Sequence, residues 1–188
     1  MERKVIEMVI NDLEDEVFAI SVVTKPAIEE NFIALSEHEI ELKTIDEDKR
    51  ILIGAVLVPE KEILRVDAKN NPYYIKFSAE TIKVSSELFL MRSKQNNVTL
   101  QHAKKLDDMS VVESWIVEDS KVDKSALYGF EYPKGTWVAM MKVNNDDVWE
   151  QVKSGAIKGF SIEGKFSDNT NLSELDLLEQ IKQLLKQI

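Results

Sequence analysis

The stretch ILIGAVLVP, residues 51–59, restricts the possible fold more than any other part of the sequence. It is almost continuously apolar and rich in β-branched residues, which is typical of a strand buried on both faces. The chain has 188 residues, of which 44% are hydrophobic. That is enough for one globular domain with an ordered core and short appendages. We therefore expect a β-rich domain with this strand in its core.

Other segments predict further strands and two helices. Strand character is found in VIEMVI, VFAISVV and TWVAMMKV, in IKGFSIEGKF, and in ILRVD and YYIKF, which flank the turn KNNP. A helix is expected after Ser78, which can cap it within an incomplete capping box. A second helix is expected in NNDDVWEQVKSG, where Asn145 or Asp146 can cap the start and Gly155 ends it.

The charged run DEDKR predicts a boundary near residue 50. We expect an N-terminal section at 1–49, with two short strands, that either packs on the core or is a propeptide. A main domain at 50–167 follows it, and a linker with an amphipathic helix occupies 168–188. In this helix, at 171–188, apolar residues recur every three or four positions, as in a coiled-coil seam. It is expected either to dock on its own domain or to form a homo-oligomer.

Composition argues against several classes of function. The net charge of −10 disfavours nucleic-acid binding, and the absence of cysteine excludes disulfides, thiolate metal sites and a cysteine nucleophile. No signal peptide or membrane-spanning run is apparent, so a soluble protein without membrane contact is expected. No second histidine lies at metal-ligand spacing from His102, and no glycine-rich phosphate loop occurs, so no metal or cofactor is expected.

The chain has two histidines, His38 and His102. His38 lies in the charged sequence SEHEIE, whereas His102 ends the apolar segment NVTLQH. If this segment pairs with VVESWIV around a turn at residues 107–108, then His102 faces Glu113 on the same side of the hairpin. A carboxylate there could fix the imidazole tautomer and stabilise an imidazolium. An ordinary cross-strand charge pair is the alternative, and a register slip of one residue would separate the two side chains.

Ser161 lies in KGFSIEGK, between Gly159 and Gly164. Glycines beside a nucleophile allow close approach of the backbone and let amides turn toward a developing oxyanion. The spacing is not the G-x-S-x-G of an α/β-hydrolase, and the regular alternation of strands and helices in that fold is also missing.

Taken in order, the segments NVTLQH, VVESWIVE, PKGTWVAMMKVNNDDVWEQVKSG and IKGFSIEG resemble the XkdF-like serine proteases of tailed phages and prophages. That family looks like part of the prohead-protease group, which shares a β-barrel with herpesvirus assemblin. The resemblance covers about residues 50–167, and FAISVVTKPAIEE is similar to the region that precedes the domain. It implies an α+β, mainly β fold: a closed or partly open antiparallel β-barrel with peripheral helices, followed here by the C-terminal amphipathic helix.

The resemblance also implies the chemistry. The family nucleophile corresponds to Ser161 in GFSIEG and the general base to His102 in TLQH. Glu113 is the preferred third member, with Asp119 as the second choice. Assemblin-type enzymes use a second histidine in this role, but His38 is poorly placed for it.

The implied activity is that of a serine endopeptidase which needs no cofactor. Its expected substrates are phage scaffold and major capsid proteins, processed during maturation of the prohead in the host cytoplasm. One alternative is a catalytically silent scaffold or assembly module that retains the protease fold. A further possibility is that the N-terminal section is removed by autocleavage.

Overall fold

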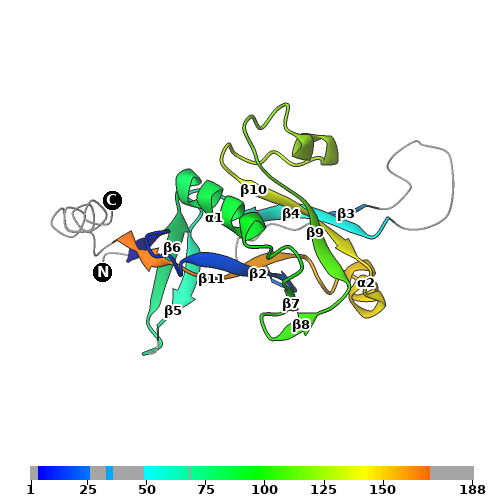
Figure 1. The fold of residues 1–188 in the computed structure, drawn as a ribbon, viewed down its shortest axis with the longest axis horizontal. Helices are drawn as coiled ribbons and strands as arrows, with labels where there is room; N and C mark the ends of the chain where they lie inside the picture. The colour runs from blue at the N-terminus through cyan, green and yellow to red at the C-terminus, as the bar shows by residue number, and fades with distance from the viewer. Residues whose placement is uncertain (1–3, 26–32, 36–48, 68, 170–188) are drawn as a thin grey trace.

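The structure of the chain is a computed structural model that describes residues 4–25, 33–35, 49–67 and 69–169 (Figure 1). Two of the expectations, the helix at 171–188 and the position of His38, lie outside the described residues. The described part is mainly β, with two α-helices and three sheets of four strands each. No closed barrel is found among these strands, so the mainly β class is confirmed and the closed form of the barrel is not.

The first two sheets form the two ends of the described structure. The first has the order β12-β1-β6-β5, and its strands are Ser167–Asp168, Val5–Val9, Pro72–Phe77 and Ile63–Val66. The second has the order β3-β4-β10-β9, and its strands are Ile33–Leu35, Ile51–Leu57, Trp137–Val143 and Met109–Ile116. The antiparallel hairpin of β5 and β6 is the one that the sequence predicts.

The third sheet connects segments that are far apart in the sequence. Its order is β11-β2-β7-β8, and its strands are Gly159–Lys165, Glu16–Val23, Val98–Leu100 and Lys104–Leu106. Strand β2 lies in its interior, antiparallel to β11 and parallel to β7. In Figure 1, β2 and β11 run side by side across the middle of the molecule. We call this sheet the central sheet.

Strand β4 is buried as the sequence predicts. Leu52 and Ile53 are fully buried, and Ala55 and Val56 are nearly so. Its neighbours β3 and β10 occupy both of its edges, and β11 packs close to it without pairing. An uninterrupted apolar sequence is stable here because both faces of the strand contact other parts of the protein.

Both helices begin where their capping residues predict. Helix α1 (Ala79–Met91) is capped by Ser78, whose hydroxyl accepts the Thr81 N–H. Helix α2 (Asp146–Lys153) is capped by Asn145, which accepts the Val148 N–H. Helix α1 lies across β2, β9 and β10 (Figure 1), and a short 3-10 helix, η2 (Lys124–Tyr128), follows β9. No helix in the described ranges is both long and apolar enough to cross a membrane.

The hairpin expected between residues 97–102 and 111–117 is not formed. Strand β7 turns back at residues 101–103 to pair with β8, and β9 pairs with β10 in another sheet. The turn comes earlier than predicted because Gln101 and His102 both adopt positive φ, 53° and 58°. Two consecutive non-glycine residues with positive φ are uncommon, so no sequence signal marked this turn.

Candidate active site

Ser161 lies in a row of polar side chains that crosses the central sheet. It is the register partner of Ser21 on β2, and Ser21 is the partner of Thr99 on β7. Side chains at directly paired positions point to the same face of a sheet. This face therefore carries three hydroxyl groups from three strands that are distant in sequence.

Glu163 extends the row along β11. Because side chains alternate between the two faces of a strand, Glu163, two residues after Ser161, lies on the same face. Its carboxylate accepts a hydrogen bond from the Thr99 hydroxyl. Only 20% of the Glu163 side chain is exposed, so the carboxylate is partly shielded from water.

His102 reaches this face from the turn between β7 and β8. Its Nδ1 lies 3.4 Å from Oε1 of Glu163, while 43% of its side chain is exposed. The carboxylate next to His102 is therefore that of Glu163. A carboxylate facing Nδ1 favours the tautomer in which Nε2 is free to accept a proton.

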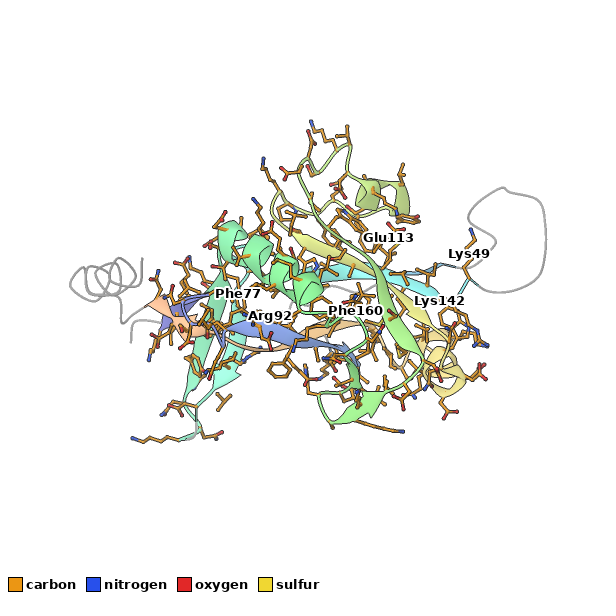
Figure 2. All side chains as sticks on the ribbon, in the orientation of Figure 1. Lys49, Phe77, Arg92, Glu113, Lys142 and Phe160 are labelled. Atoms are coloured by element: carbon orange, nitrogen blue, oxygen red, sulfur yellow. The ribbon has the colours of Figure 1, made fainter. Side chains whose placement is uncertain are left out.

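The pairing of His102 with Glu113 that hairpin symmetry predicts is wrong. Glu113 lies on β9, opposite Met140 in the second sheet, and its carboxylate binds the Lys124 ammonium. In Figure 2, Glu113 is labelled on the side of the molecule that carries η2, the helix of its partner Lys124. The second choice, Asp119, accepts the Lys121 N–H in the loop after β9.

Ser161 itself is 6% exposed, and its chain neighbour Phe160 belongs to the apolar core. In the described part of the chain, its hydroxyl makes no hydrogen bond, and none joins it to His102. Ser21 differs, because its hydroxyl is fully buried and its hydrogen bonds go to the backbone of β7 and of the following turn. Of the two serines, Ser161 is therefore the one whose hydroxyl has no hydrogen-bond partner among the described residues.

Two carboxylates at the N-terminal end of β2, those of Asp15 and Glu16, have lowered pKa values. The hydrogen bond from Arg92 lowers the pKa of Glu16, with a further contribution from Lys94. Burial alone would raise the pKa of Asp15, but its hydrogen bonds with Asn11, Ser167 and Asp12 together lower it. Both groups are ionised at neutral pH and hold β2 against α1 and β12.

No metal site accompanies these groups. Within the described ranges, no three histidine, cysteine, aspartate or glutamate side chains are close enough together to hold an ion. The groups at this face can support proton transfer by His102, nucleophilic attack by a serine and electrostatic stabilisation by Glu163.

Sequence reasoning missed three residues of this face, namely Ser21, Thr99 and Glu163. The signal for Glu163 was present, because the Ser-x-Glu spacing on a strand puts both side chains on one face. The signal for Ser21 was weaker: a single hydroxyl residue within the otherwise apolar run VFAISVV. That β2 lies beside β11 could not be deduced from either pattern.

A serine, a histidine and a carboxylate on one face form the set of groups that serine peptidases use, on many unrelated folds. The chain belongs to the family described as "Putative phage serine protease XkdF", which matches residues 37–170. The XkdF-like resemblance expected from the sequence is thereby confirmed.

A curated relative is the phage-like element PBSX protein XkdF of Bacillus subtilis (strain 168). It is 26% identical over 122 residues, which are 65% of this chain. The matched region spans 39% of the length of that relative. No solved structure matches the chain significantly.

Proposed function

We propose that this chain is a serine endopeptidase in which Ser161 is the nucleophile, His102 the general base and Glu163 the residue that orients His102. One observation carries this proposal. Ser161 and Glu163 project from the same face of β11, and the imidazole of His102 lies 3.4 Å from the Glu163 carboxylate. Family membership supports the class of reaction.

In this mechanism Nε2 of His102 takes the proton from the Ser161 hydroxyl as its oxygen attacks the scissile carbonyl carbon. The resulting imidazolium is stabilised by Glu163 at Nδ1. When the peptide C–N bond breaks, His102 protonates the leaving amine and the acyl group stays on Ser161. A water molecule, deprotonated by His102, then hydrolyses this ester and returns the serine.

The Ser161 hydroxyl and His102 are not hydrogen-bonded in this structure, so the mechanism requires them to come together when substrate binds. Contacts of this kind are often loose in unliganded enzymes and tighten in the complex. His102 is the mobile partner in this step, because almost half of its side chain is exposed while Ser161 lies on a buried strand.

The substrates that we propose are phage scaffold and major capsid proteins, cleaved within the assembling prohead in the host cytoplasm. Support comes from the phage origin named in the family description and from the resemblance of four segments of the sequence to prohead proteases. The N-terminal section contributes β2, which lies between the strand of Ser161 and the strand that leads to His102, so we do not include its removal in this proposal.

The test is co-expression of the chain with the scaffold and shell proteins encoded beside it. Wild type is expected to give shortened shell protein, and Ser161→Ala is expected to give none. Ser85→Ala is the matched control, because Ser85 is also buried but lies on α1 and donates to the Thr81 carbonyl. Normal processing by Ser161→Ala would end the assignment of the nucleophile.

A second candidate is a catalytically silent assembly module with the same fold. The missing hydrogen bond between Ser161 and His102 is the observation that favours it. This candidate predicts intact substrates with wild type, and no covalent adduct when the purified protein is incubated with an alkyl fluorophosphonate.

A further inference from the structure

Ser21 is a hydroxyl group in the most protected part of the central sheet. Its exposed fraction is 0%, and its neighbours Ile20 and Val22 are also fully buried. A buried hydroxyl is unfavourable unless it is hydrogen-bonded. Ser21 satisfies this requirement in both directions: its Oγ donates to the Thr99 carbonyl at 3.3 Å and accepts the His102 N–H at 2.9 Å.

The second of these bonds reaches a strained turn. The residues Gln101 and His102 have the positive φ values that a type I′ turn requires, and the Ala103 N–H closes the turn on the Leu100 carbonyl at 3.1 Å. Asn and Gly are the residues that tolerate these angles, and neither is present. The conformation therefore needs support from surrounding contacts.

Strand β2 supplies that support through two consecutive contacts. The Val22 carbonyl accepts the Gln101 N–H at 3.1 Å, and the Ser21 hydroxyl accepts the His102 N–H. The backbone N–H groups of Gln101 and His102 are thus both hydrogen-bonded to β2. The second contact is made by a side chain, so a substitution can remove it without breaking the sheet.

We propose that Ser21 is a positioning residue, which holds the backbone of His102 so that its imidazole faces Glu163 and can reach Ser161. This proposal rests on the proposed function, because positioning His102 affects catalysis only if His102 is the general base for Ser161. Ser21 is not itself the nucleophile, because its oxygen is fully buried and already hydrogen-bonded. Ser21 also precedes the region matched by the family, which begins at residue 37. The proposed role of Ser21 therefore comes from the N-terminal strand β2 and not from the matched region.

The experiment compares Ser21→Ala with Ser85→Ala in the full chain. Both remove a fully buried serine hydroxyl, but Ser85 contacts Thr81 and lies on α1, away from His102. Urea unfolding gives the folded fraction of each variant, and an alkyl fluorophosphonate titrates the nucleophile. We expect Ser21→Ala to lower the maximal labelling rate about threefold to tenfold, with an unchanged concentration dependence. Ser85→Ala should label at the wild-type rate per folded molecule.

A second readout follows His102 directly and does not depend on catalysis. The chain contains two histidines, so in a His38→Gln background His102 is the only histidine that contributes ring signals to a nitrogen-15 NMR spectrum. We expect one dominant tautomer, protonated at Nδ1, when Ser21 is present, and a mixture of tautomers in Ser21→Ala. Ser21→Thr, which keeps a hydroxyl, should restore the single tautomer if it folds.

The outcomes separate the two proposals. A wild-type labelling rate together with a wild-type tautomer in Ser21→Ala would overturn the role of Ser21. A rate that falls only in proportion to the folded fraction, as in the Ser85 control, would do the same. If wild type is not labelled at all, the proposed function fails, whereas the tautomer of His102 still decides whether Ser21 positions it. Label that survives Ser161→Ala and disappears in Ser21→Ala would overturn both.

Discussion

Glu163 and Glu113 offer a matched test of which carboxylate acts with His102. Glu163→Gln removes the negative charge but keeps an oxygen for the Thr99 hydroxyl, so folding should be retained. We expect its maximal rate of fluorophosphonate labelling to fall by about a hundredfold to ten-thousandfold, as expected when the carboxylate that fixes the histidine tautomer is lost.

Glu113→Gln removes a half-exposed surface partner of Lys124 and should label within about twofold of wild type, since such ion pairs contribute little. Equal rates for the two variants would contradict the assignment of Glu163. A larger loss for Glu113→Gln would restore the pairing expected from the sequence.

The ionisation of Asp15 makes the free energy of unfolding depend on pH. Because its pKa is lowered in the folded protein, the ionised carboxylate stabilises the fold above its ordinary pKa of 3.8. This contribution is lost as the pH falls through the lower, folded value. Asp15→Asn should therefore reduce the free energy of unfolding by about 1–3 kcal/mol at pH 7.

The same substitution should cost less at pH 3, because this pH lies below the ordinary pKa of 3.8 and the carboxyl of the unfolded chain is then largely protonated. Urea unfolding at the two pH values measures both differences. A cost that is the same at pH 7 and pH 3 would show that the charge of Asp15 does not contribute.

At the scale of the elements, Gly164 determines how closely β11 approaches β2. The register of the two strands shifts between Glu163 and Gly164, and a Cβ atom at Gly164 would lie 2.6 Å from the Glu16 carbonyl oxygen. The sequence indicated that this glycine allows a close approach, and the approaching group is the protein's own strand.

Gly164→Ala should force the two strands apart and lower the free energy of unfolding by about 1–3 kcal/mol. Lys165→Ala next to it removes only an exposed ion pair with Glu14 and should cost at most about 1 kcal/mol. The urea midpoints of the two variants measure the difference. Equal midpoints would mean that β11 can accommodate a methyl group by a small shift.

Elements with local signals could be predicted from the sequence, and pairings between distant segments could not. Ser78 and Asn145 cap their helices as expected because a cap involves residues only three apart. The partners of β7 and β9 depend on contacts with β2 and β10 that no local pattern reveals. The prediction of Glu113 failed for this reason. Ser161 and His102 remain predictions, although the structure brings both to the central sheet.

At the scale of the whole molecule, the N-terminal strands are integrated with strands from the rest of the chain. Strand β1 pairs with β6 and β12, and β2 pairs with β7 and β11. Removing both would take Val17, Ile20 and Val22, which are fully buried, out of the core.

A chain that begins at residue 50 should therefore fail to fold, as measured by the loss of dispersion in its amide NMR spectrum. The full chain under the same conditions is the control. A folded fragment that still reacts with fluorophosphonate would contradict this expectation and would revive the idea of a removable N-terminal section.

The order of strands in the central sheet has a consequence for timing during protein synthesis. Strand β2 leaves the ribosome early, β7 later and β11 last, yet β2 must lie between the other two before Ser161, His102 and Glu163 share a face. Closing contacts between such distant segments is slow compared with forming local ones. If Ser161 is the nucleophile, the nascent chain is inert until β11 has been made and inserted, so it cannot attack neighbouring proteins before that point.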